Sequence, residues 1–218
     1  MFFPYRDDNP HILVPYVTYG IIALNIFVFC IQMGMEFSDP LAARSFIYSF
    51  GLVPADFGIV NIFTSMFLHG GFAHIIGNMW FLWIFGDNVE SALGHTRFIV
   101  FYLLCGIAAA LLQVIIDPSS QIPMVGASGA IAGVLGAYMI RYPRARVHVF
   151  VFIFIFISTI RIPAMYVLGF WFLMQLSSGL GTLGLDTTGG VAWFAHIGGF
   201  IAGIGFERAS RLIKFEKV

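Results

Sequence analysis

Six apolar stretches without an internal charge are the feature that most limits what this chain can fold into. They lie at roughly residues 15–34, 72–86, 97–116, 124–140, 162–178 and 191–206. Of the 218 residues, 59% are hydrophobic and only 10% are charged, which is too little polar surface to cover a water-soluble domain of this length. Since a helix needs about 20 apolar residues to cross a bilayer, the stretches predict an all-α polytopic membrane protein with six transmembrane helices.

The positively charged residues predict how these spans are oriented. With a cytoplasmic N-terminus, ten of the eleven Lys and Arg residues fall on the cytoplasmic side, and only Arg44 lies outside. Residues 147–160 are apolar but short for a span, and a seventh span there would move Arg161 and the C-terminal basic residues outside. We therefore expect this segment to be interfacial or re-entrant, and both termini to be cytoplasmic. The chain then divides into an N-terminal segment (1–14), a six-span membrane domain (15–206) and a basic C-terminal tail (207–218).

Charge and cysteine usage exclude several kinds of partner. The basic residues lie at the ends of spans, which indicates topology and contact with membrane lipids, so no nucleic-acid partner is expected. Cys30 and Cys105 both lie inside apolar stretches, as packing thiols do, so neither a disulfide framework nor a metal site is expected. No cofactor is expected either. The N-terminus lacks the features of a signal peptide. The short tails and the absence of a transit peptide favour a bacterial inner (plasma) membrane.

Three predicted spans bring polar side chains to one depth. The second, fourth and sixth spans all run inward, and His74, Ser128 and His196 precede the charge that ends each span by 12 or 13 residues. At 1.5 Å per residue, each side chain lies about 18–20 Å above the inner edge of the membrane. Asn78 lies one turn below His74 on the same helix face. Taken singly, each residue could serve helix packing, but their shared depth favours a common site.

Glycines beside these residues predict a close helix crossing. Two GxxxG pairs follow the serine of the fourth span and the histidine of the sixth, namely Gly129 with Gly133 and Gly199 with Gly203. Small residues at this spacing let two helix backbones approach closely. Such a crossing could bring the hydroxyl within about 2.6–3.2 Å of the imidazole, where a base can take the proton of a serine nucleophile.

Other groups at the same depth could stabilise an oxyanion. Ser128 falls in the first turn of its helix, where backbone N–H groups have no intrahelical partner. Asn78 and His74 can each add a side-chain donor, as the tetrahedral intermediate of acyl transfer requires. The two nearest acids, Asp117 and Asp186, fall in outer loops. A Ser–His dyad is therefore favoured over a triad.

These residues lie in motifs that resemble those of the rhomboid family of intramembrane serine proteases. The motifs are GASGA (126–130), AHIGGFIAG (195–203) and FLHGGFAHIIGNMWFLWIFGDNVESALG (67–94), and the similarity covers roughly residues 61–206. The resemblance implies a rhomboid-like fold with a long structured outer loop between the first two spans. It also implies cleavage of transmembrane segments of other membrane proteins near the outer membrane face, through an acyl-enzyme intermediate.

The resemblance implies a role for each matching residue. The catalytic roles are Ser128 as nucleophile, His196 as general base and acid, and His74, Asn78 and the Ser128 backbone N–H as the oxyanion hole. The supporting residues are Gly126, which keeps the loop open over the nucleophile, Gly129, Gly199 and Gly203 in packing, and His69 and Glu90 in structural contacts.

Two positions depart from the family pattern. Val60-Asn61 stands where many relatives carry Trp-Arg, which puts the anchoring of the first loop in question. Ala132 stands where some relatives carry a tyrosine that stacks on the imidazole, which leaves open what packs against His196. The glycine-rich loop 177–193 is expected to cap the site and to move when substrate enters.

Two alternatives from other functional classes stay open. One is a catalytically inactive rhomboid-like protein that binds membrane helices. The other is a transporter lined by His69, His74 and His196. A metalloprotease is excluded because the sequence has no His-Glu-x-x-His motif.

Overall fold

The computed structural model describes residues 2–10, 12–153, 156–183 and 191–212, and most of them are helical. Each predicted apolar stretch forms one long helix: α1 (Tyr16–Ser38), α4 (Phe72–Leu93), α5 (His95–Ile116), α6 (Ser128–Arg141), α7 (Ala164–Thr182) and α8 (Trp193–Leu212). Among the described residues, α1, α5 and α7 are each long and apolar enough to cross a membrane. A fourth candidate is α4 joined to the short helices before it, which are bent from it by 90°.

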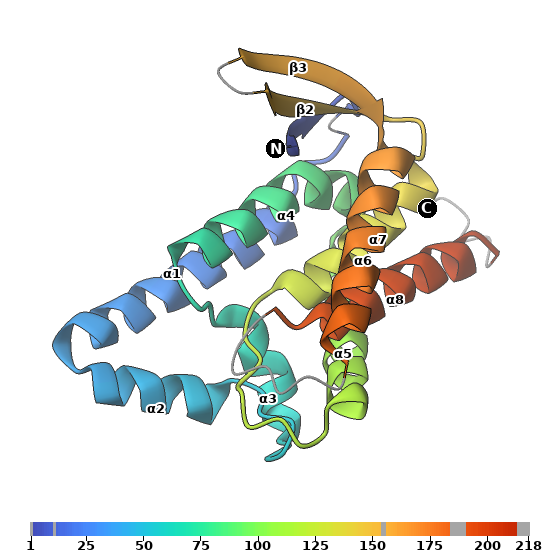
Figure 1. The fold of residues 1–218 in the computed structure, drawn as a ribbon. Coiled ribbons are helices and arrows are strands. Elements are labelled where there is room, and N and C mark those ends of the chain that lie inside the picture. Colours follow the sequence, from blue (N-terminus) through green and yellow to red (C-terminus); the bar gives the residue numbers. More distant parts are fainter. Residues whose placement is uncertain (1, 11, 154–155, 184–190, 213–218) are drawn as a thin grey trace.

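The helix α6 lies at the centre of the molecule (Figure 1), and α5, α7, α8 and α4 pack around it. All ten residues from Gly129 to Tyr138 are buried, which is typical of a helix surrounded by other helices. Small side chains make this possible, because they let the neighbouring helices approach α6 on several sides. The fourteen residues of α6 rise only about 21 Å, so the helix begins inside the molecule and not at its edge.

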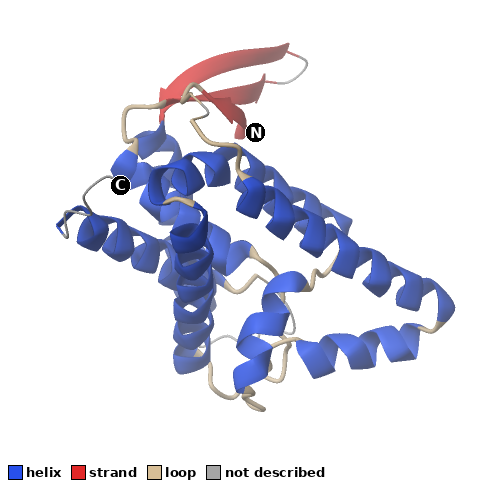
Figure 2. Ribbon diagram, turned by 180° about the vertical axis from the view of Figure 1, so that it is seen from behind, coloured by secondary structure: helices blue, strands red, loops and turns tan. Residues whose placement is uncertain are grey.

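A three-stranded antiparallel sheet lies at one end of the helices, and this end is called the sheet face (Figure 2). Its strands are β1 (Phe2–Asp7), β2 (Arg146–Ile153) and β3 (Phe156–Pro163), in the order β1-β2-β3. The all-α prediction is therefore wrong for these segments. The described residues of the segment 147–160 belong to the antiparallel strands β2 and β3, with Val149 opposite Ile160, and they do not re-enter the helical bundle. Their β-branched and aromatic residues favour a strand over a helix.

The N-terminal strand is tied to the helical bundle by side chains as well as by β2. Tyr138 of α6 donates its hydroxyl to the carboxylate of Asp7, and Asn88 of α4 donates to the same carboxylate over 3.1 Å. The indole N–H of Trp80 donates to the carbonyl of Pro4 at 2.8 Å. Of the predicted N-terminal segment 1–14, Phe2–Asp7 form strand β1 of the sheet.

The chain between α1 and α4 forms the helices α2 (Pro40–Phe50) and α3 (Ile59–Thr64) and the 3-10 turn η1 (Ser65–Phe67). Asn61 anchors this region, because its amide N–H groups donate to the carbonyls of Ser49 at 2.9 Å and Gly51 at 2.8 Å. Gln32 of α1 holds the backbone on the other side, since its amide bonds both the N–H and the carbonyl of His69. The region is therefore structured without the Trp-Arg pair that many relatives carry.

Glu90 joins α1 to α4 near the sheet face. Its buried carboxylate accepts from the backbone N–H of Val17 at 2.9 Å and from the backbone N–H and hydroxyl of Thr18 at 2.7 and 2.6 Å. The first N–H groups of α1 have no intrahelical partner, so this carboxylate supplies the missing acceptor. Glu90 thus serves structure, far along α4 from its N-terminal end.

Candidate active site

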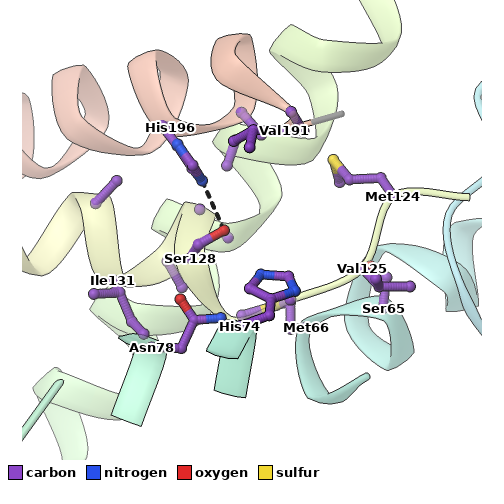
Figure 3. A pocket seen from close by; sticks show the side chains of 18 of the residues that line it. Ser65, Met66, His74, Asn78, Met124, Val125, Ser128, Ile131, Val191 and His196 are labelled. Atoms are coloured by element: carbon purple, nitrogen blue, oxygen red, sulfur yellow. Dashed lines mark hydrogen bonds between the residues drawn. The ribbon is translucent and has the colours of Figure 1, made fainter. Parts of the chain in front are cut away.

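Ser128 and His196 meet where the helices α6 and α8 begin. Ser128 is the first residue of α6, and His196 lies in the first turn of α8. The serine Oγ and the histidine Nε2 are 2.8 Å apart, which is hydrogen-bond distance (Figure 3). The imidazole is buried, with 9% of its residue surface exposed, whereas the serine is only partly buried.

Backbone contact between α6 and α8 fixes this approach. A Cβ atom added to Gly199 would lie 1.9 Å from the carbonyl oxygen of Gly129, and one added to Gly203 would lie 2.0 Å from that of Gly133. Both distances are far below van der Waals contact, so only glycine fits at these positions of α8. The structure thus brings both predicted glycine pairs into one helix crossing beside the serine and the histidine.

His74 and Asn78 of α4 lie on the opposite side of the serine from His196 (Figure 3). All four side chains line one cavity of about 590 Å³. The Asn78 Nδ2 is buried and has no partner among the described residues, so it is free to donate to a bound group. The backbone N–H of Gly70 donates to His74 Nδ1 at 3.3 Å, which places the ring proton on Nε2.

Gly126 shapes the wall between these donors and the serine. Its φ of +121° lies in the region that favours glycine, and an added Cβ would lie 2.7 Å from His74 Cε1 and Nε2. Its N–H donates to the carbonyl of Ser65 at 2.9 Å, which fixes the loop before α6. A side chain here would occupy the space that leads from His74 to the nucleophile candidate.

His196 has a second hydrogen-bond partner that the sequence analysis missed. Gln175 of α7 is buried, and its Oε1 lies 2.7 Å from His196 Nδ1. The ring of Trp171 lies against the imidazole, with the centroids 5.8 Å apart and the planes at 36°. Trp171 is therefore an aromatic side chain that packs against His196 when residue 132 is alanine. The only sequence signal for Gln175 was a single amide in an apolar span, which has no spacing pattern to mark it.

The remaining predicted positions lie around the site or beyond it. His69 does not line the cavity, but its ring packs edge-on against His74 with a centroid distance of 5.1 Å. The predicted cap comprises residues 177–193, of which 184–190 lie outside the described residues. The end of the predicted tail, 213–218, also lies outside them.

Comparisons with known proteins place the chain among the rhomboids. The family profile described as Rhomboid domain matches residues 56–209. Rhomboid protein 1, mitochondrial, of Saccharomyces cerevisiae is 28% identical over 93% of this chain and 54% of its own length. Rhomboid protease GluP of Bacillus subtilis is 30% identical over 87% of this chain and 34% of its own length. The human presenilin-associated rhomboid-like protein, mitochondrial, is 31% identical over 59% of this chain and 33% of its own length.

These relatives overturn the predicted location of the protein, and the chain covers only part of their length. The chain spans between a third and about half of the length of these relatives. Several of the matching proteins are named as mitochondrial, so the prediction of a bacterial plasma membrane location is wrong. That prediction rested on short tails and a missing transit peptide, which do not separate bacterial from organellar membranes. The match of the family profile over more than half of the sequence shows that this chain belongs to the rhomboid family.

Proposed function

We propose that this protein is an intramembrane serine endopeptidase that cleaves transmembrane segments of other membrane proteins through a Ser–His dyad. The observation that carries the proposal is the 2.8 Å contact between Ser128 Oγ and His196 Nε2 inside a cavity that His74 and Asn78 also line. A serine becomes a strong nucleophile when a base at this distance takes its proton. The protease named among the relatives, GluP, aligns with 87% of the chain, which supports the same chemistry.

The proposed reaction uses a base on one side of Ser128 and hydrogen-bond donors on the other. Ser128 Oγ attacks the carbonyl carbon of the scissile bond while its proton passes to His196 Nε2. The carbonyl oxygen becomes an oxyanion, which accepts hydrogen bonds from His74 Nε2–H, Asn78 Nδ2–H and the Ser128 backbone N–H. Each such donor stabilises the transition state by about 3–4 kcal/mol.

The intermediate then collapses. The imidazolium gives its proton to the leaving amine, which departs and leaves an ester between the substrate and Ser128. Water attacks this ester, with His196 acting again as the base, and the second product is released. The enzyme returns to its starting protonation state.

The position of the site sets where a substrate is cut. In this proposal the six long helices of residues 15–206 cross the bilayer among its lipids, with the β-sheet at one membrane face. Arg141 ends α6 near the sheet face, and Ser128 lies about 20 Å from it along the helix. Cleavage is therefore expected in the half of the membrane that lies away from the sheet. The substrate must unwind locally there, so segments of low helix propensity are favoured.

A fluorophosphonate probe tests the activated serine without a known substrate. The purified protein in mild detergent is treated with the probe, and the adduct is mapped by mass spectrometry. We expect an adduct on Ser128 that is lost in Ser128→Ala and in His196→Ala. Unlabelled but folded wild-type protein, with probes of several sizes, would refute the proposal.

A further inference from the structure

We propose that Gln175 is a positioning residue that holds His196 in the tautomer and orientation required of a base toward Ser128. The inference rests on the proposed function, since it concerns the same base. Its structural basis is one chain of hydrogen bonds that runs from α7 through the imidazole to the serine. In that chain Gln175 Oε1 lies 2.7 Å from Nδ1, and Nε2 lies 2.8 Å from the serine Oγ.

The direction of the Gln175 amide is fixed by its own helix. Its Nε2 donates to the carbonyl of Trp171, four residues earlier on α7, at 3.4 Å. A flipped amide would place its oxygen against that carbonyl, and two acceptors would then face each other. The amide therefore presents Oε1 to the imidazole. Because the side chain is buried and contacts both α7 and α8, it has little room for another arrangement.

The amide oxygen in turn decides which ring nitrogen carries the proton. Oε1 is only an acceptor, so Nδ1 of His196 must be the donor and carry hydrogen. In a neutral imidazole the other nitrogen, Nε2, then has a free lone pair. That lone pair faces Ser128 Oγ, which donates its hydroxyl hydrogen. The resting site is thus already in the protonation state in which the base can act.

The same contact also holds the ring while its charge changes. When Nε2 takes the serine proton, Nδ1 keeps its hydrogen and continues to donate to Oε1, so no bond in the chain has to break. A hydrogen bond from a charged group is stronger than one from a neutral group, so the contact stabilises the imidazolium. Trp171 packs beside the imidazole and limits its rotation. An uncharged amide thus performs the orienting task that a carboxylate performs in a triad.

The test compares three variants by the kinetics of labelling with a fluorophosphonate probe. Gln175→Leu keeps the volume but removes the acceptor, Gln175→Glu keeps an oxygen at the same reach, and Gln113→Leu is the matched control. Gln113 is a second amide that bonds α8, through the backbone N–H of Ala195, without touching the imidazole. Probe concentration is varied so that the maximal labelling rate and the half-saturating concentration are measured separately.

We expect Gln175→Leu to lower the maximal labelling rate by about 10–100-fold with little change in half-saturation. Gln113→Leu should stay within about threefold of wild type, and Gln175→Glu should label faster than Gln175→Leu, because in both variants an oxygen acceptor on Nδ1 is retained. Equal rates in Gln175→Leu and wild type would overturn the inference while the proposed function stands. Absence of labelling in wild type itself would refute both.

A second measurement reads the tautomer of His196 in wild-type protein directly, and variants serve only for assignment and comparison. Nitrogen-15 NMR of labelled histidine distinguishes the two neutral tautomers, and the spectrum of His196→Ala identifies the signal among the six histidines. We expect wild type to carry the proton on Nδ1 and Gln175→Leu to show a mixture. A wild-type signal from the Nε2–H tautomer would overturn the inference even if labelling is observed.

Discussion

The close crossing of α6 and α8 predicts a large effect of Gly199→Ala, which adds a single methyl group to α8. A Cβ at this position would lie 1.9 Å from the carbonyl oxygen of Gly129, and that atom belongs to the backbone of α6. The neighbour cannot rotate away as a flexible side chain would. To reach an ordinary contact of 3.4 Å, the two helices must separate locally by about 1.5 Å.

The size of this separation determines the expected loss of labelling rate. Added to the 2.8 Å between Ser128 and His196, it would end their hydrogen bond. A misplacement of about 1 Å costs roughly 10²-fold in rate, so Gly199→Ala should lower the rate of fluorophosphonate labelling by at least that factor. Overpacking should also lower the free energy of unfolding by about 1–3 kcal/mol.

Gly205→Ala is the matched control on the same helix. Among the described residues, no atom outside its chain neighbours and the nearby backbone of α8 lies within 4 Å of a Cβ added there, so this variant should label at the wild-type rate. It should be as stable as wild type or more stable, because alanine favours a helix by about 1 kcal/mol over glycine. Labelling of Gly199→Ala at the wild-type rate would show that α6 and α8 are not held together as described.

Three further predictions concern contacts outside the dyad. Glu90→Ala should lower the free energy of unfolding by about 3 kcal/mol, because it leaves the first N–H groups of α1 without their charged acceptor, and thermal unfolding in detergent measures this. Asn61→Leu should loosen the region between α1 and α4, with a loss of about 1–2 kcal/mol and faster proteolysis there. The hydrogen bond from His148 holds the pKa of Asp8 below its usual 3.8, so His148→Ala should raise that pKa toward 3.8 in a carboxyl NMR titration.

Each of these predictions has a result that contradicts it. An unchanged unfolding temperature in Glu90→Ala would show that water replaces the carboxylate. Unchanged proteolysis of Asn61→Leu would mean that other contacts hold the loop. For Asp8 the sign is fixed: a depressed folded pKa stabilises the sheet above the unfolded pKa, and the stabilisation fades as the pH falls through the folded pKa. An Asp8 pKa that does not respond to His148→Ala would contradict the contact.

The long helices could be predicted from the sequence because burial in lipid leaves a strong signal in composition. Each of the six apolar stretches contains a helix, although the ends differ from prediction. The fourth stretch was predicted to begin at residue 124, but α6 begins at Ser128 because Gly126 has a φ of +121°, which a right-handed helix does not allow. Such a dihedral angle cannot be derived from hydropathy.

The β-hairpin was missed although its signal is present. Residues 147–160 were considered only as a short apolar segment, whereas strings of valine, isoleucine and phenylalanine favour a strand. Part of the reason is non-local, since β2 gains its partner β1 from the other end of the chain. Hydrophobic periodicity reports on one segment at a time and cannot identify such a pairing.

The candidate site could be predicted only in part, because backbone features leave a pattern in the sequence and single side-chain contacts do not. The proximity of Ser128 and His196 follows from backbone features, namely span direction, depth and glycine spacing, which the sequence contains. The contact of Gln175 with the imidazole depends on how α7 packs and on which way one flexible side chain points. Neither property has a sequence pattern.

The pairing of β1 with β2 also constrains the order in which this protein can fold. The register joins Phe3 to Phe150, so every helix from α1 to α6 is synthesised between the two partners. During translation and membrane insertion, β1 has no strand to pair with until β2 has been made. Contacts between segments so distant in sequence also form late in folding. Closing the sheet therefore follows the assembly of the central helices. Deleting Phe2–Asp7 should accordingly spare insertion of the helices while exposing the edge of β2 to pairing with other chains.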